Sequence, residues 1–365
     1  MTNADSRVTL LLAVKDRLPL AHRWMRFMDQ EQCPYRIIVA DGSLDNDSGR
    51  FFANTSDFPN LAYEYIRFAP DKNYSDFFRK VSTALDLVDT PYVLMADDDD
   101  FYCLEGIRTA MGFLDEHPDF VCARGSYLGF SVETSGHGEE VTGAHTVYGE
   151  MRFKGAIYPS TTIAEDTSAG RMAANFSRWT PTWYSIHRTD IWRACWNEVA
   201  ALNLMNIFLF EHTLTAMVAA RGKIFAGQYP YYYRQVDGSY VTSSQEAKNR
   251  NGDWFDQMLS EYWSADYAAF VNLVSTDIAN RDGISKDAAI TLVNASYRNY
   301  YGPNVASVLS VRRGAAEEKM ARFYWRLRSL LSICVKTYRA SRPIMRALKT
   351  NQSTVRLKIF LANKN

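Results

Sequence analysis

The sequence predicts an α/β fold whose central sheet is mainly parallel and flanked by helices, with a helical extension at the C-terminus. Short apolar runs that suit buried strands alternate with segments whose apolar residues recur at helical spacing, and this alternation is typical of βαβ units. The chain has 365 residues, of which 47% are hydrophobic and 22% charged. It can therefore bury a large core and is unlike a disordered chain.

The first third of the chain carries the clearest alternation. Strands are expected over residues 8–14, 35–40, 62–68 and 92–96, and a helix is expected over residues 77–88. A further helix is expected after the first strand, because Leu20, Trp24 and Phe27 fall on one helical face.

Aspartates stand where three of these strands end. Asp16 follows the first strand, Asp41 the second and Asp97 the fourth. Ligands of open parallel sheets bind beyond the carboxyl ends of the strands. We therefore expect three acidic groups at one rim of the sheet, beside a bound ligand.

The rest of the chain is patterned less clearly. Extra strands and loops are expected over residues 121–158, a mobile loop over 163–179, strands over 183–187 and 224–233, and helices over 190–201 and 211–220. Helical patterning dominates from about Asp253 onward, and no internal repeat or low-complexity linker is found. We therefore divide the chain into a domain over residues 1–250 and a helical C-terminal region over residues 251–365.

Four consecutive aspartates, Asp97 to Asp100, follow the apolar strand over residues 92–96. Carboxylates that share a site repel one another and raise one another's pKa, and a divalent cation removes this penalty. Oxygen ligands at the end of a strand suit Mg²⁺ or Mn²⁺, particularly an ion that bridges to phosphates. The alternative is a solvated acidic loop. The metal site implies a phosphorylated substrate.

The chain carries no sequence signal for export. Its five cysteines are scattered without metal-binding spacing, which fits buried thiols in a reducing compartment. The N-terminal residues lack the basic and apolar regions of a signal peptide, and no apolar stretch is long enough to span a membrane. We expect a cytoplasmic protein.

The C-terminal tail is strongly basic. Residues 312–365 contain 14 Lys and Arg residues against two acidic residues. Apolar side chains recur on one helical face within residues 312–349, with cations around the rest, so this segment could bind an anionic membrane on the inner face of the cell membrane. The alternative is a helix that packs against the first domain or a second subunit. The tail lacks the aromatic and glycine pattern of an RNA-binding module, so we expect no nucleic-acid partner.

Several segments together resemble the family 2 glycosyltransferases of the GT-A fold, in particular the bacterial branch of surface-polysaccharide loci. The matching segments are Val8–Arg17, Ile37–Ser43, Lys80, Thr90–Phe101, and Phe210–His212 ahead of Arg221–Lys223. The resemblance covers roughly residues 8–240. It implies a Rossmann-like GT-A sheet, with a nucleotide-sugar half over residues 1–120 and an acceptor half over residues 121–250.

The resemblance implies a set of donor-binding residues. Donor contacts are expected from Asp16, Asp41, Ser43, Lys80, Asp97, Asp98 and Arg234. Asp16 and Asp41 would contact the nucleobase and ribose, and strand-end carboxylates can accept hydrogen bonds from both. Structural alternatives remain open for several of them: a helix cap or salt bridge for Asp16, a turn for Asp41, a solvated helix lysine for Lys80 and an ion-paired arginine for Arg234.

The aspartate run falls where this family has its DXD motif. Asp97 and Asp99 would hold the metal, with Asp99 as the direct ligand and Asp97 towards the ribose. The family places its catalytic base in a Glu-Asp pair at a helix start, and this chain has Glu211-His212 there. Glu211 is the first candidate base and His212 the second, because an imidazole can accept a proton near neutral pH. Trp183 and Asp100 are expected on the acceptor side.

We therefore expect a metal-dependent, inverting glycosyltransferase that uses a nucleotide-diphosphate sugar and either Mn²⁺ or Mg²⁺. Its acceptor would be a glycan or a lipid-linked saccharide of a bacterial envelope polysaccharide, and a homo-oligomer is open. Two alternatives remain. A nucleotidyltransferase would favour a glycine-rich loop after the first strand, and Lys15-Asp16-Arg17 contains no glycine. A non-catalytic glycan- or membrane-binding protein on a decayed transferase scaffold would fit the altered Glu-Asp pair.

Overall fold

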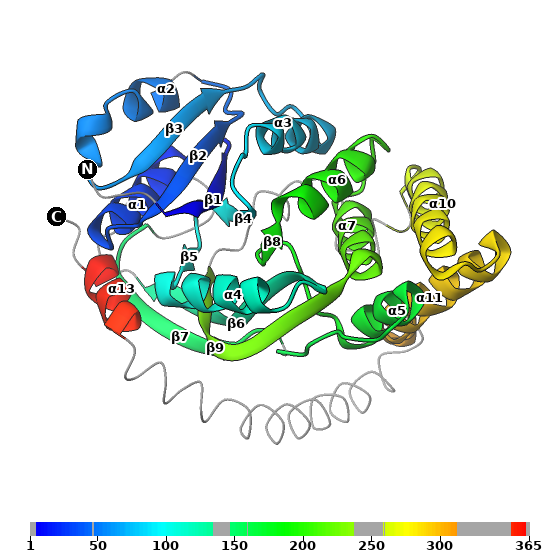
Figure 1. The fold of residues 1–365 in the computed structure, drawn as a ribbon. Helices are drawn as coiled ribbons and strands as arrows, with labels where there is room; N and C mark the ends of the chain where they lie inside the picture. The colour runs from blue at the N-terminus through cyan, green and yellow to red at the C-terminus, as the bar shows by residue number, and fades with distance from the viewer. Residues whose placement is uncertain are drawn as a thin grey trace.

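The computed structural model shows a curled mixed sheet with helices on both faces (Figure 1). The structure describes residues 5–45, 47–133, 147–158, 160–236, 258, 260–311 and 352–362. Within these residues nine strands form the sheet, in the order β3-β2-β1-β4-β8-β6-β9-β5, with β7 paired to β6. The predicted α/β class is confirmed.

The first four strands form the parallel part of the sheet. They are β1 (Asp5–Val14), β2 (Tyr35–Asp41), β3 (Ala62–Arg67) and β4 (Tyr92–Asp97). The helices between them are α1 (Leu18–Gln30), α2 (Asp47–Phe52), the 3₁₀ turn η1 (Thr55–Asp57) and α3 (Tyr74–Asp86). Val14 of β1 pairs with Asp41, and its neighbour Ala13 pairs with Asp97, so the three strands end at one rim.

The second half of the sheet is mixed. Its elements are β5 (Phe101–Tyr102), α4 (Leu104–Glu116), β6 (Phe120–Glu133), β7 (Glu150–Ala156), α5 (Ser168–Arg178), β8 (Ile186–Arg188), α6 (Thr189–Ala200), α7 (Ile207–Arg221) and β9 (Lys223–Gln235). The short strand β8 runs antiparallel between β4 and β6 and joins the two halves, whereas β6 and β9 pair in parallel. The mainly parallel arrangement expected from the sequence therefore applies to the nucleotide half.

Helix α5 replaces the loop expected over residues 163–179, so that prediction is wrong. Thr167 caps the helix by accepting a hydrogen bond from the backbone N of Gly170 at 3.0 Å. Its inner face carries polar side chains that are buried, among them Arg171 and Asn175. Arg171 donates to the carbonyls of Ala219 and Ala220, both at 2.8 Å, near the end of α7. A buried face that satisfies backbone carbonyls with arginine does not appear as an apolar stripe.

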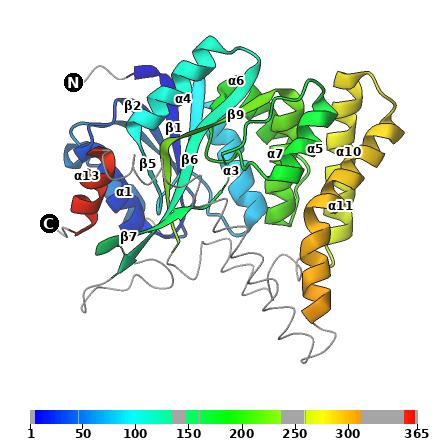
Figure 2. The same cartoon turned by 90° about the horizontal axis from the view of Figure 1, so that it is seen from below.

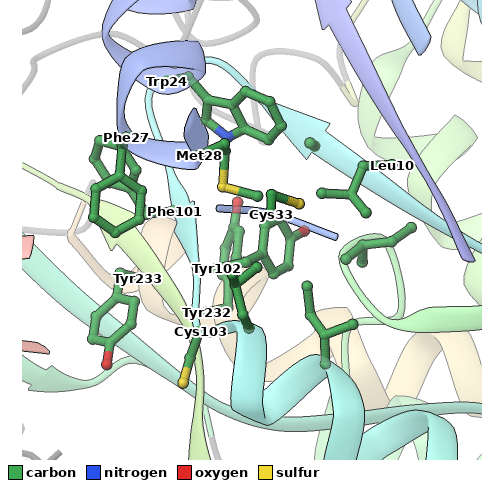
Figure 3. Packing of buried hydrophobic residues seen from close by; sticks show 14 of the residues in the cluster. Leu10, Trp24, Phe27, Met28, Cys33, Phe101, Tyr102, Cys103, Tyr232 and Tyr233 are labelled. Carbon is green, nitrogen blue, oxygen red and sulfur yellow. The ribbon is translucent and has the colours of Figure 1, made fainter. Parts of the chain in front are cut away.

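Two hydrophobic clusters, one on each face of the sheet, account for its stability. Side chains alternate along β1, so Leu10 and Leu12 join the cluster under α1 whereas Leu11 joins the cluster under α3. Figure 3 shows part of the first cluster, where the rings of Phe27 and Phe101 lie 4.8 Å apart. Strands buried on both faces explain the continuous apolar runs in the sequence.

The C-terminal helices lie at opposite ends of the molecule (Figure 1). Helices α10 (Trp263–Asp282) and α11 (Lys286–Val311) lie beside α5 and α7 and extend the second cluster (Figure 2). Helix α13 (Gln352–Ala362) lies near α1 and β7, and its Phe360 ring is 5.3 Å from that of Phe27. The division near residue 250 stays a prediction.

The predicted membrane-binding segment, residues 312–349, lies outside the described residues. Among the helices that the structure does describe, none combines the length and the apolar character that crossing a bilayer requires.

Candidate active site

A pocket of about 300 Å³ opens at the carboxyl ends of β1 and β4, between α3 and α7. Its acidic lining residues are Asp71, Asp97 and Glu211, and its basic ones are Lys15, Arg17, Lys80 and Arg234. Aromatic side chains complete the wall, including Tyr74, Phe77, Tyr158, Trp183 and Tyr184. The pocket therefore joins the predicted donor rim to the predicted base and acceptor residues.

The aspartate run gathers its carboxylates at this rim. Oxygens of Asp97, Asp99 and Asp100 all lie within 4.8 Å of one another. Burial, and then the charge of Asp99, raises the pKa of both Asp97 and Asp100. Burial raises the pKa of Asp98 to about 7, against the opposing effect of Arg17. The repulsion expected from the sequence is therefore present, and the cluster is not a solvated loop.

Two stacked tyrosines hold members of the cluster. The hydroxyl of Tyr184 donates to Asp97, the hydroxyl of Tyr232 donates to Asp100, and the two rings lie 4.6 Å apart. Asp100 also accepts from the backbone N of Gln235 at 2.7 Å. Both oxygens of Asp100 thus face the protein interior, and the side chain does not line the pocket. This arrangement suits a positioning role better than the predicted contact with an acceptor.

Arg17 supplies one of the positive charges beside the cluster, and the buried Arg23 supplies another. It donates to Oδ2 of Asp99 at 3.0 Å and forms an ion pair with Asp98, whose side chain is fully buried. Burial alone would lower the pKa of Arg17, but the carboxylates of Asp98 and Asp99 raise it above its usual value.

The cluster fits a hard divalent cation. Asp97 and Asp99 offer oxygen ligands only, at a spacing that one ion can bridge, and such a donor set is typical of Mg²⁺ and Mn²⁺ sites. Asp97 also lines the pocket, so an ion between these two residues would face a ligand bound there.

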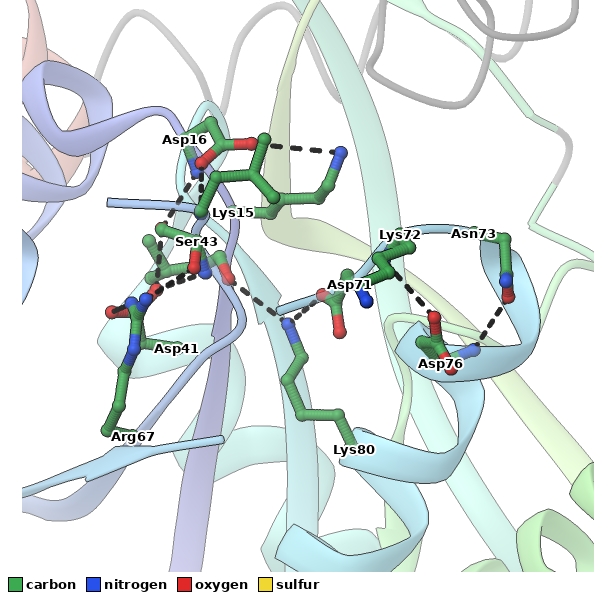
Figure 4. Close-up of polar contacts among 12 residues, drawn as sticks. Lys15, Asp16, Asp41, Ser43, Arg67, Asp71, Lys72, Asn73, Asp76 and Lys80 are labelled. Atoms are coloured by element: carbon green, nitrogen blue, oxygen red, sulfur yellow. Dashed lines mark hydrogen bonds and ion pairs between the residues drawn. The ribbon is translucent and has the colours of Figure 1, made fainter. Parts of the chain in front are cut away.

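Asp41 is engaged within the protein (Figure 4). It accepts from the backbone N and the hydroxyl of Ser43 at 2.8 and 2.6 Å, from the hydroxyl of Tyr65 at 2.7 Å and from Arg67 at 2.6 Å. Burial would raise the pKa of Asp41, but these hydrogen bonds lower it overall. Asp41 and Ser43 do not line the pocket, so their predicted nucleotide contacts would require this network to rearrange.

Asp16 occupies a strained turn at the end of β1. Its φ of 54° is unusual for a residue other than glycine, and such conformations cluster at functional sites. The backbone N of Asp16 donates to the Ser43 hydroxyl at 2.8 Å, and its carboxylate accepts from the backbone N of Leu44 at 2.6 Å. The two loops that follow β1 and β2 are thereby tied together, and the Asp16 side chain remains exposed.

Lys80 is a buried pocket residue, so the alternative of a solvated helix lysine is wrong. Its ammonium donates to Asp71 at 2.5 Å and to the carbonyl of Val14 at 3.1 Å, and the residue is only 4% exposed (Figure 4). Burial lowers the pKa of Lys80 and raises that of Asp71, with their mutual attraction opposing both shifts. A Cβ on Gly42 would lie 2.4 Å from the Asp71 carboxylate, so a larger residue at this turn would have to push that carboxylate aside.

Glu211 and His212 lie on different sides of α7. Glu211 lines the pocket, and burial raises its pKa, with Arg234 opposing and Asp97 adding to the shift. His212 is 3% exposed and contacts the hydroxyls of Tyr297 at 3.3 Å and Tyr301 at 3.2 Å. Burial lowers the pKa of His212 to about 3. The imidazole therefore belongs to the core rather than to the pocket, and of the two candidate bases only Glu211 lines the pocket.

Arg234 and Trp183 both line the pocket, as expected from the sequence. Arg234 donates to the hydroxyl of Tyr158 at 3.4 Å. Among the residues that the structure describes, it forms no ion pair with a carboxylate. The Trp183 ring packs 5.1 Å from that of Trp196, so it serves both the core and the pocket wall.

Sequence reasoning missed Arg17, Asp71, Tyr158 and Tyr184 as pocket residues. Arg17 directly follows Asp16 at a strand end, a position that could have singled it out. Tyr158 ends a segment in which only strands and loops without clear bounds are expected, and Tyr184 lies in an expected strand whose pattern does not distinguish it from its neighbours. The contact between Asp71 and Lys80 depends on the turn of the chain between β3 and α3. Neither helical or strand periodicity nor a position at a strand end identifies these three residues.

Comparison with known proteins supports the fold. No protein-family model matches the sequence, and no curated protein matches it. Among solved structures, the chain is similar to the crystal structure of S. aureus TarS 1–349, with 15% identity over 86% of this chain and 77% of that chain and a TM-score of 0.51. S. aureus TarS 1–349 in complex with UDP-GlcNAc matches over the same shares at 14% identity and a TM-score of 0.49. The likeness to the first of these is one of fold, and the chain has a GT-A-like fold.

Proposed function

We propose that this protein is a glycosyltransferase that moves a sugar from a nucleotide-diphosphate donor to a hydroxyl group of an acceptor. One observation carries the proposal: the carboxylates of Asp97 and Glu211 line a single pocket at the carboxyl rim of a GT-A-like sheet. A metal-binding acid and a candidate base on the two sides of one cavity are what a sugar transfer between a donor and an acceptor requires.

The basic side chains of the pocket support a diphosphate donor. Lys15, Arg17 and Arg234 reach the pocket from two different segments of the chain, and guanidinium groups bind phosphate oxygens in pairs. Asp97 and Asp99 would hold Mg²⁺ or Mn²⁺, which neutralises charge that develops on a departing diphosphate.

Glu211 is the proposed catalytic base of an inverting transfer. The acceptor oxygen attacks the anomeric carbon, the bond from that carbon to the diphosphate oxygen breaks, and the acceptor proton passes to Glu211. Burial, which raises the pKa of Glu211, makes its carboxylate a better proton acceptor than an exposed glutamate. His212 lies outside the pocket and takes no part.

The aromatic wall of the pocket favours a carbohydrate acceptor. Tyr158, Trp183 and Tyr184 offer apolar ring faces with polar edges, which suit the two kinds of surface on a sugar ring. We propose a glycan or lipid-linked saccharide of a bacterial envelope polysaccharide as the acceptor class. The TarS complexes contain UDP and UDP-GlcNAc.

A hydrolysis assay tests the function. The full chain is incubated with a panel of nucleotide-diphosphate sugars and Mn²⁺, and the nucleoside diphosphate and free sugar that are released are measured. We expect release from at least one donor, and loss of that release in Asp99→Ala. Asp89→Ala, which removes an exposed aspartate paired with Arg36, is the matched control.

The products distinguish the alternatives. Release of inorganic pyrophosphate from a nucleoside triphosphate, in place of nucleoside diphosphate from a sugar nucleotide, would identify a nucleotidyltransferase. Absence of turnover with every donor, in a folded protein with and without Mn²⁺, would leave a non-catalytic scaffold and reject the proposal.

A further inference from the structure

Arg17 contacts both the acidic cluster and the pocket. It belongs to the loop between β1 and α1, its guanidinium bridges Asp98 and Asp99, and its side chain is 18% exposed. The same side chain lines the pocket. A single positive charge therefore separates two buried acids from the space in which a donor diphosphate would bind.

The position of this guanidinium conflicts with a divalent cation. Arg17 pairs with Oδ2 of Asp99, whose carboxylate belongs to the acidic cluster, at 3.0 Å. A divalent ion bound to Asp97 and Asp99 would lie within a few ångströms of the guanidinium, and like charges so close together repel strongly where water is excluded. Arg17 and the ion therefore compete for the carboxylate of Asp99.

The pocket offers Arg17 a second partner. Lys80 is held by Asp71 and by the Val14 carbonyl, so it is less free to follow a ligand. Arg17 lies at the pocket wall on a loop, and a diphosphate carries several oxygens that a guanidinium can bind in pairs. If the ion replaces the guanidinium beside Asp98, that buried carboxylate still keeps a positive charge nearby.

We propose that Arg17 is an internal counter-ion that occupies the acidic cluster before a metal ion binds and turns to the donor diphosphate once the ion takes its place. Metal binding then becomes conditional on the donor, since the nucleotide supplies the negative charge that draws Arg17 away. This inference rests on the proposed function, because it assigns the pocket to a diphosphate.

Manganese binding without any nucleotide tests the competition. Free Mn²⁺ is followed by electron paramagnetic resonance during titration of the wild-type protein and of Arg17→Gln. We expect Arg17→Gln to bind Mn²⁺ about tenfold more tightly, which corresponds to about 1.4 kcal/mol, because the competing charge is gone. Equal or weaker binding by the folded variant would overturn the inference.

Two control variants separate competition from a general change of charge. Arg17→Lys keeps a positive charge and should bind Mn²⁺ much as the wild type does. Arg36→Gln removes an arginine that bridges two carboxylates at the surface, Glu64 and Asp89, and should leave Mn²⁺ affinity unchanged. An increase in Arg36→Gln equal to that in Arg17→Gln would reduce the effect to net charge and contradict the proposal.

Folding and function are checked separately. If Arg17→Gln unfolds because Asp98 loses its partner, Asp98→Asn is added to it, and the double variant should still bind Mn²⁺ more tightly than the wild type. With the donor found by the hydrolysis screen, Arg17→Gln should need less Mn²⁺ for half-maximal rate and show a higher donor KM. An unchanged donor KM would remove the diphosphate role. Failure of the wild type in the hydrolysis screen, by contrast, rejects the proposed function and leaves the manganese result standing.

Discussion

Replacing Glu211 with glutamine tests the proposed base with almost no change in side-chain shape. Glutamine cannot accept the acceptor proton, and general-base catalysis contributes about 10²- to 10⁴-fold, so kcat should fall by that factor. The loss corresponds to about 2.7 to 5.5 kcal/mol in the activation barrier. The pKa of Glu211 is raised by burial, so its charged form is unfavourable to the fold above its unfolded pKa. The neutral variant should therefore be at least as stable as the wild type at pH 7.5.

Steady-state transfer kinetics and thermal unfolding measure the two effects together. We expect kcat to fall while donor KM changes little, with an unchanged or higher Tm for Glu211→Gln. In the wild type, kcat should decline as the pH falls through the raised pKa of Glu211, and the variant should lack that decline. His212→Gln alters the neighbouring residue outside the pocket and should keep the wild-type pH profile. A variant that loses only donor affinity, or retains kcat within about threefold, would refute the base assignment.

Three further results are expected. Lys80→Met should lower the free energy of unfolding by about 3–5 kcal/mol in denaturant titrations, because the side chain of Asp71 is only 1% exposed and would lose its partner. Adding Asp71→Asn to this variant should recover most of the lost stability. If no stability is recovered, the pairing of Lys80 with Asp71 is contradicted. Burial lowers the pKa of His187 and of His212 to about 3. As the pH falls below 6.5, these histidines bind protons in the unfolded chain but not in the folded protein, so the free energy of unfolding should decrease by up to about 1.4 kcal/mol per pH unit for each histidine. His212→Gln should reduce this slope, and an unchanged slope would argue against the buried neutral ring. Trp183→Ala should reduce transfer to an acceptor more than donor hydrolysis, and an equal reduction of both would place Trp183 on the donor side.

The parallel half of the fold could be predicted because its signals are local. The strand over residues 92–96 is apolar on both faces, so it reads as a continuous run and ends where the aspartates begin. Helix α5 could not be predicted in this way. Its inner face uses Arg171 to satisfy carbonyls of α7, 48 and 49 residues further along the chain, and such a contact leaves no periodic apolar pattern.

The site could be predicted in part for the same reason. Asp97 stands out at the end of an apolar strand, Glu211 is a candidate only through the resemblance to the family's Glu-Asp pair, and the structure places both in the pocket lining. The partner of each acid depends on long-range contacts. Asp41 is paired by Arg67 of the neighbouring strand, and Asp99 is paired by Arg17, 82 residues earlier. Sequence spacing does not show that these two carboxylates already have cationic partners.

The most direct measurement is anomalous diffraction at the manganese edge from crystals grown with Mn²⁺ and the nucleotide sugar selected by the hydrolysis screen. We expect one manganese peak within about 2.5 Å of carboxylate oxygens of Asp97 and Asp99, with the diphosphate beside it and the anomeric carbon facing Glu211. A nucleotide sugar bound away from this pocket, or bound in it with both carboxylates still paired only to the protein, would contradict the central claim.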